Sequence, residues 1–409
     1  MSRVGEVVAP RRLGTSFRWL LASSWVSNLG DGVALAAGPL LVASLTEDPL
    51  LVALAATLQW LPPLVLGPLA GALSDRLDRR RLVVRVDVLR AAVLLVLTAT
   101  VLAGHATIAT VLLALLLVGC CEVFADNTSQ TLLPMLVDRD DLAVGNARLQ
   151  TGFITVNQLA GPPLGAALFT VGHALPFGLQ ALLVGLGAVL VARVRLPAHV
   201  PAAAPGQVHH DVLDGFRWVR HHAAVRTLVL TVLVFNVTFG AAWSVLVLWA
   251  QERLGAGPVG YGLLTTTSAV GGLLGTALYG RLTRRLSLGD LMRIGLVLET
   301  LTHLAFALTT DLAVALAVML VFGVHAFVWG TTSVTVRQRA VPTAFQGRVG
   351  AVNTVGVFGG LVVGSGIGGL LARELGVTAP FWFAFVGSAL FCVLLWRQLS
   401  HVALEDAAA

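Results

Sequence analysis

Six ionisable side chains stand inside long apolar stretches of this chain. They are four carboxylates and two imidazoles: Asp31, Glu122, Asp126, Glu299, His303 and His325. An ionised side chain at the centre of a bilayer costs at least ~2.5 kcal/mol on insertion scales, so such residues usually face a cavity or a partner. Carboxylates and imidazoles bind and release protons, and a carboxylate also binds a cationic ligand. These residues are therefore the predicted sites of proton coupling or of substrate charge.

Glu122 and Asp126 are four residues apart and so share one face of a helix. Two ionised carboxylates at that spacing repel each other, so we expect one of them to hold a proton at rest. The alternative is structural: either carboxylate hydrogen-bonds the backbone beside a helix break.

Glu299 and His303 repeat the four-residue spacing in a later apolar segment, and His325 stands at a comparable depth in the next one. A carboxylate beside an imidazole can pass a proton or hold a cationic substrate. His325 has a plainer alternative as a hydrogen-bonded interior histidine. Glu299 is the preferred single candidate for coupling or substrate charge.

Amides and aromatic rings in other apolar segments suit an amphipathic organic ligand. The candidates for a cavity lining are Asn157, Gln158, Asn236 and Trp243. Tryptophan also gathers at membrane interfaces, which is the alternative for Trp243. The pairs His209-His210 and His221-His222 lack acidic partners and fit a solvated connection better than a metal site. No metal is expected.

The composition predicts the elements that must position these residues. The chain has 409 residues, of which 56% are hydrophobic and only 12% are charged, about half the charged fraction of soluble domains. This composition is typical of a helical protein that crosses a membrane many times. The sequence contains no lysine, which excludes a phosphate-loop ATPase and a Schiff-base enzyme. Neither a cofactor nor nucleic acid is expected as a partner.

Twelve apolar segments of about 20 residues fit the thickness of a bilayer. They fall near 19–42, 50–74, 83–102, 108–130, 148–171, 176–194, 227–251, 259–282, 290–309, 312–334, 348–372 and 379–397. We therefore predict an all-α membrane protein with two six-helix bundles, over 1–194 and 227–409. The connection 195–226 alternates apolar and charged residues over 211–220, which predicts an amphipathic helix at the inner membrane surface.

The arginines orient this bundle. All of them except Arg253 and Arg373 fall at connections that lie on one side of the predicted membrane. Arg90 is counted here among the arginines around the connection between the second and third spans. Cytoplasmic connections carry the excess of basic residues, so both termini are predicted to be cytoplasmic.

The two halves resemble each other. The segment 71–81 ends in an arginine cluster, and a fainter copy at 275–285 follows 204 residues later. Gly161-Pro-Pro-Leu-Gly165 has a counterpart in Gly364-Ser-Gly-Ile-Gly368 at nearly the same offset. Matches at one common offset indicate a duplicated six-helix unit.

With these motifs the chain resembles the major facilitator superfamily over essentially its whole length. The signature of that superfamily between helices 2 and 3 matches at Gly71, Asp75, Arg76, Arg79 and Arg80, while Asp78 replaces its second glycine.

A second signature, found in helix 5 of the superfamily's drug–proton antiporters, is similar to Gly152, Gly161, Pro162 and Gly165. The segments Asn28-Leu-Gly-Asp31 and Asp87-Val-Leu-Arg90 are most similar in sequence to bacterial efflux members of the enterobactin-exporter and macrolide-efflux type. The helix 4 arginine of many proton antiporters is absent.

The resemblance implies a major facilitator fold in the bacterial inner membrane and secondary transport by alternating access. The expected activity is proton-coupled export of small amphipathic compounds such as a drug, an antibiotic or a secondary metabolite, by a monomer. Asp75 is expected to act as a gate that docks at the start of span 11, near Gly347-Arg348, where a helix N-terminus carries partial positive charge. The alternative for this loop is a topological signal alone.

Two other functions remain open from the sequence. One is an uptake carrier or a lipid or siderophore transporter on the same fold. The other is a membrane-embedded enzyme, for which the sequence offers neither a Gly-x-Ser-x-Gly turn nor paired metal-ligand histidines in its spans.

Overall fold

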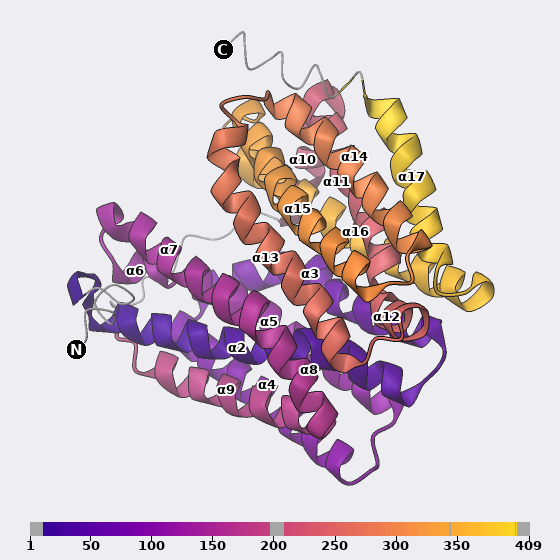
Figure 1. The fold of residues 1–409 in the computed structure, drawn as a ribbon. Coiled ribbons are helices and arrows are strands. Elements are labelled where there is room, and N and C mark those ends of the chain that lie inside the picture. The colour runs from indigo at the N-terminus through magenta and orange to yellow at the C-terminus, as the bar shows by residue number, and fades with distance from the viewer. Residues whose placement is uncertain (1–10, 197–207, 343–344, 397, 399–409) are drawn as a thin grey trace. The chain divides into compact units, whose positions relative to one another are not determined.

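A computed structural model describes residues 11–196, 208–342, 345–396 and 398. Within these ranges the chain forms helices and short connections and contains no strand. The helices divide into two compact units, which are described separately (Figure 1). Unit 1 comprises residues 1–45 and 65–205, and unit 2 comprises residues 46–64 and 206–409. The predicted all-α membrane architecture is confirmed.

Unit 1 is built from long helices joined by tight turns. Its elements are η1 (Arg11–Leu13), α2 (Gly14–Leu45), the second part of α3 (Pro49–Arg76), α4 (Arg79–Leu102), α5 (Ile108–Gln130), α6 (Leu133–Leu136), η2 (Arg139–Asp141), α7 (Leu142–Gly152), the π-helix η3 (Phe153–Ala160), α8 (Gly161–Val171) and α9 (Leu175–Ala192). Side chains fix several helix starts. Asp78 accepts from the backbone of Arg81 at the start of α4, and Thr107 forms a capping box with Thr110 at the start of α5.

Unit 2 contains the first part of α3 and the later helices. These are α10 (Val208–His221), α11 (Ala223–Trp243), α12 (Leu246–Leu254), α13 (Pro258–Leu282), α14 (Leu288–Leu308), α15 (Leu312–Ala340), α16 (Gln346–Leu375) and α17 (Ala379–Leu395). Ser287 and Asp311 cap the starts of α14 and α15 with their side chains. Gly255 ends α12 in the left-handed conformation, which glycine adopts without a steric cost.

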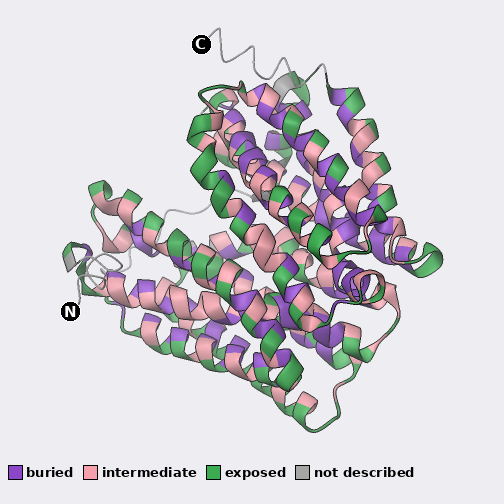
Figure 2. Cartoon of the chain, viewed as in Figure 1, coloured by how far each residue is buried: buried purple, intermediate pink, exposed green. Residues whose placement is uncertain are grey.

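Eight of the described helices are long and apolar enough to cross a membrane. The remaining four predicted spans also fall on helices, namely α4, the run α7–η3–α8, α13 and α17. Helix α4 differs from the eight because it carries Arg85, Asp87 and Arg90 in its apolar part. Exposed positions occur along many of the helices (Figure 2). They include large apolar residues such as Val96, Leu182 and Val393. Such surfaces fit contact with lipid tails.

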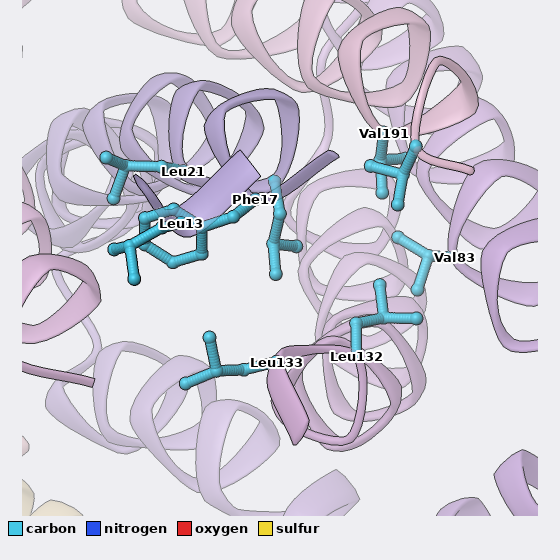
Figure 3. Packing of buried hydrophobic residues seen from close by; sticks show 9 residues of the cluster. Leu13, Phe17, Leu21, Val83, Leu132, Leu133 and Val191 are labelled. Atoms are coloured by element: carbon cyan, nitrogen blue, oxygen red, sulfur yellow. The ribbon is translucent and has the colours of Figure 1, made fainter. Parts of the chain in front are cut away.

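Each unit has a buried apolar core at the helix interfaces. In unit 1 side chains from α2, α4 and α9 meet α6, and Figure 3 shows Phe17, Val83, Leu133 and Val191 pointing toward one another. In unit 2 the core joins α11, α14, α15 and α17 around Leu228, Met292, Trp329 and Cys392. Helices in a bilayer gain little from hiding apolar surface, so their association depends on close contact of this kind.

Glycines bring equivalent pairs of helices together in the two units. A Cβ on Gly161 or Gly165 of α8 would overlap the backbone of α2 at Gly32 and Val33. In unit 2 a Cβ on Gly364 of α16 would likewise overlap α11 at Val237. Val33 and Val237 are 204 residues apart, the offset of the sequence repeat. Small residues in these places allow the helix backbones to touch.

The helix-5 motif extends this contact. Gly152, at the end of α7, lies against the indole of Trp25 on α2, and that indole donates to the backbone oxygen of Arg148 at 3.2 Å. Pro162 is buried in the first turn of α8, and because proline has no N–H it donates no hydrogen bond to the preceding π-helix η3. In the structure this motif is a packing surface for α2.

Helix α10 covers the whole of the amphipathic segment 211–220 that the sequence predicts. It packs on the start of α16 through Gly215, which lies against the backbone oxygen of Arg348, and through Trp218, whose ring stacks on Phe345 at 5.6 Å. Phe216 on another side of the helix is exposed. Its place at the inner membrane surface stays a prediction.

The replacement Gly364→Val should destabilise unit 2, because the new side chain would overlap the backbone of α11. Overpacking of a well-packed site costs about 1–3 kcal/mol. Gly366→Val in the same helix is the matched control, since no atom lies within 4 Å of its Cβ position. Thermal unfolding of the detergent-purified variants measures the difference. Equal midpoints for the two variants would contradict the packing described for α11 and α16.

Candidate functional site

The centre of unit 1 holds a buried ion pair. Arg90, in the middle of α4, is only 1% exposed. Its Nη2 contacts Asp31 Oδ1 of α2 and lies 3.6 Å from Glu122 Oε2 of α5. A guanidinium is always charged and can only donate hydrogen bonds, so it needs carboxylates around it when water is absent. Three helices are therefore joined at this point by charge.

Gln180 of α9 adds a fourth helix to this centre. The buried amide donates from Nε2 to the same Asp31 oxygen at 3.3 Å. Gly30 of α2 makes room for Gln180, because a Cβ there would lie 3.3 Å from the Gln180 side chain. Gln180 thus orients Asp31 toward Arg90.

The centre carries more acid than base. Arg90 interacts electrostatically with Asp31, Asp87, Glu122 and Asp126. Asp87 is buried on α4, the side chain of Glu122 is 40% exposed, and Asp126 is exposed. Four ionised carboxylates around one guanidinium would leave three negative charges uncompensated. A site with this balance can take up protons or a cation.

Arg90 requires a correction to the sequence analysis, which counted it among the arginines around a connection. Helix α4 starts at Arg79, four residues before the predicted span, and places Arg90 twelve residues beyond its N-cap Asp78. Asp87 and Arg90 were thus missed as site residues. The available signal was their three-residue spacing within the predicted span 83–102, which puts an acid and a base on one helix face.

Unit 2 has a second buried cluster, in which one carboxylate lies between two imidazoles. Glu299 Oε1 is 3.0 Å from His303 Nε2, and Glu299 Oε2 is 3.3 Å from His325 Nε2. All three side chains are at most 2% exposed. The structure brings together the three residues that the sequence placed at similar depth. With Glu299 ionised, one proton added to either neutral imidazole makes the cluster neutral overall.

Aromatic rings enclose this cluster. Trp243 of α11 contacts His303 edge-on, with 6.1 Å between ring centroids, and Phe322 contacts His325 in the same way at 5.2 Å. Phe239 stacks on Trp243 at 4.4 Å and extends the aromatic surface along α11. Nδ1 of both histidines is buried without a hydrogen-bond partner in the described part of the chain. Among the described residues, no group of three or more histidine, cysteine, aspartate or glutamate side chains could hold a metal ion.

The other predicted cavity residues lie in different surroundings. Asn236 is buried and donates to the backbone oxygen of Val232 at 2.7 Å, beside Gly360 of α16. Asn157 is buried in η3, where its backbone lies against Gly32, next in sequence to Asp31. Gln158 is exposed. Their role as cavity residues stays a prediction.

Arg79 and Arg80, the first residues of α4, donate hydrogen bonds within unit 1. Gly71 and Arg76 lie in the last turns of α3. Arg79 donates to the backbone oxygen of Ser74 at 3.3 Å and contacts Met135 Sδ at 3.1 Å, and Arg80 donates to the backbone oxygen of Val194 at 3.1 Å. The side chain of Asp75 lies outside the described part of the structure, so its role as a gate stays a prediction.

Removal of the Arg90 charge should strongly destabilise unit 1. Arg90→Met leaves the Asp31 carboxylate in the bundle without its cation, and loss of one partner of a buried pair costs about 3–5 kcal/mol. Arg90→Met combined with Asp31→Leu should recover much of this loss, because no unpaired ion remains. Arg85→Met, at an exposed position on the same helix, is the control. Thermal unfolding in detergent measures all three, and an unfolding midpoint of Arg90→Met equal to that of Arg85→Met would contradict the assignment.

Comparison with known proteins agrees with this architecture. The family model described as "Transmembrane secretion effector" matches residues 7–408. The chain is 26% identical over 397 residues to "Multidrug resistance protein 1" of Bacillus subtilis (strain 168), covering 94% of this chain and 96% of that protein. It is 22% identical over 368 residues to "Macrolide efflux protein A" of Streptococcus pyogenes, covering 86% and 87% of the two chains.

A solved structure shows the same fold. The inward-facing structure of a bacterial homologue of the iron transporter ferroportin superposes with a TM-score of 0.75 at 18% identity, covering 94% of this chain and 98% of that one. The bacterial relatives agree with the predicted location in the inner membrane. The chain therefore belongs to the transmembrane secretion effector family of the major facilitator superfamily, as a multi-pass membrane transporter and not an enzyme.

Proposed function

We propose that the protein exports small amphipathic compounds in exchange for protons, by alternating access. The observation that carries this proposal is the buried cluster of Glu299, His303 and His325, which places proton-binding groups in the interior of unit 2. Ionisable groups in such positions are costly and are typical of proton and ion pathways. The excess of carboxylates around Arg90 supports the same function in unit 1.

The relatives support export as the direction. Their names describe multidrug resistance, multidrug efflux and macrolide efflux in bacteria. The half-buried aromatic face of α11, formed by Phe235, Phe239 and Trp243, suits a ligand with a large apolar part. One proton that enters down a potential of ~100 mV releases about 2.3 kcal/mol. That free energy maintains a gradient of about 50-fold for a neutral compound.

Alternating access requires two bundles that move against each other around a midplane site. We assign these bundles to 1–194 and 227–409, joined by 195–226, and we assign the gate to Asp75. The glycine contacts of α8 with α2 and of α16 with α11 support rigid bundles, because they lock helices together within each unit.

Neutral variants of the two preferred carboxylates should lose proton-linked efflux. Glu299→Gln and Glu122→Gln each remove a charge that holds or carries the coupling proton, so active efflux of ethidium or erythromycin from expressing cells should fall to the background of a protonophore-treated culture. Glu374→Gln, at the exposed end of α16, is the matched control and should retain efflux. Unchanged efflux in both Glu299→Gln and Glu122→Gln would refute the coupling assignment.

Transport direction separates export from uptake on the same fold. An exporter should lower the ethidium content of intact cells and accumulate ethidium in inverted vesicles energised with a proton gradient. Accumulation in intact cells would instead indicate an uptake carrier. Movement of fluorescent phospholipid between leaflets, without transport of either drug, would indicate a lipid transporter.

The arginine distribution predicts that both termini are cytoplasmic. Green fluorescent protein fused to the C-terminus should therefore fluoresce, and alkaline phosphatase fused at the same place should be inactive, because that enzyme needs the oxidising periplasm for its disulfides. The reverse pair of results would overturn the orientation.

A further inference from the structure

We propose that the chain carries two independent proton-binding centres, built around central ions of opposite charge and placed at equivalent positions of its two units. The first consists of Arg90 with its carboxylates in unit 1, and the second consists of Glu299 with its two imidazoles in unit 2. The role of both in transport rests on the proposed proton coupling. The existence of two separate centres does not, and it is tested here without transport.

The helix starts establish the equivalence. Arg90 lies twelve residues after Asp78, the N-cap of α4, and Glu299 lies twelve residues after Ser287, the N-cap of α14. At 1.5 Å per residue both stand about 18 Å along their helices. Both are 1% exposed. Counted from the helix starts, a buried ion therefore stands at the same depth in α4 and in α14, but it is a cation in one and an anion in the other.

The partners also come from equivalent elements. Glu122 lies on α5, fifteen residues after its N-cap Thr107, and His325 lies on α15, fourteen residues after its N-cap Asp311. Each central ion thus has a partner on the next long helix. The partner of Arg90 is the carboxylate of Glu122, and the partner of Glu299 is the imidazole of His325, which becomes a cation when it is protonated. Asp31 and His303 complete the two centres from different elements, so the resemblance ends at these pairs.

The opposite charge of the two central ions, Arg90 and Glu299, determines how each centre binds its proton. In unit 1 the permanent charge of Arg90 neutralises one carboxylate, and the surplus carboxylates accept protons. In unit 2 the carboxylate of Glu299 lies beside both imidazoles, so its negative charge compensates a proton added to either ring in this apolar site. A proton therefore binds to a carboxylate in unit 1 and to an imidazole in unit 2.

Different charged groups surround each centre. Among the described residues, the charged groups that act on Glu299 are His303 and His325. Neighbouring helices add two tyrosines and a cysteine to the titratable groups of this part of unit 2: Tyr261, Tyr279 and Cys392. The charged groups that act on one another in unit 1 are Asp31, Asp87, Arg90, Glu122 and Asp126, with the thiols of α5 beside them at Cys120 and Cys121.

Potentiometric titration of the purified, detergent-solubilised protein between pH 8.5 and 5.5 counts the protons taken up. Glu122→Gln removes an accepting carboxylate of unit 1, and Glu299→Gln removes the negative charge that supports an imidazolium in unit 2. Each should lower the uptake by about one proton, and the combined variant by about two. His105→Asn, at an exposed loop position outside both centres, is the control for removal of a single ionisable side chain.

The count overturns the proposal if Glu299→Gln or Glu122→Gln takes up as many protons as the wild type, or if the combined variant loses no more than one of the single variants. If Glu299→Gln does not purify as a folded protein, the apolar variant Glu299→Met/His303→Leu/His325→Leu replaces it. Buried ionic clusters often tolerate such exchange. Protonophore-insensitive efflux together with additive proton losses would refute the proposed function and leave the two centres standing.

Discussion

The low dielectric of the membrane interior requires that each ion in a helix bundle find its compensation inside the bundle. In unit 1 this constraint ties α2, α4, α5 and α9 together, because Arg90 needs Asp31 and Glu122, and Asp31 in turn accepts from Gln180. In unit 2 it joins α14 and α15 through Glu299 and His325. Water would satisfy the same groups on a soluble surface, and the helices would then be free of this restraint.

Close backbone contact provides the second restraint, and it lies at other helix pairs. The glycines of α8 and α16 hold α2 and α11 at contact distance without any charge. Both kinds of contact are made by adjacent residues of α2. Asp31 pairs with Arg90, and Gly32 and Val33, which follow it, contact the glycines of α8. A side chain at Gly32 would separate α2 from η3 and disturb Asp31 in the same step.

Much of this arrangement follows from the sequence, because apolar runs of membrane length leave few alternatives to helices. The pairing of Glu299 with His303 also follows, since four residues make about one helical turn. The contact with His325 does not, because it depends on the rotation of α15 about its own axis. Arg90 was misplaced for a related reason: an arginine near a connection is counted as cytoplasmic, although the capping of α4 by Asp78 moves the helix start and places Arg90 in the interior.

The π-helix η3 explains the spacing of the helix-5 glycines. Gly152 and Gly161 are nine residues apart, which in an α-helix is two and a half turns and would point them to opposite sides. Both nevertheless face α2, at Trp25 and at Gly32. The wider turns of η3 between them, with hydrogen bonds five residues apart, remove the half turn. The π-helical segment thus accounts for two glycines that lie nine residues apart in the sequence and still pack against the same helix.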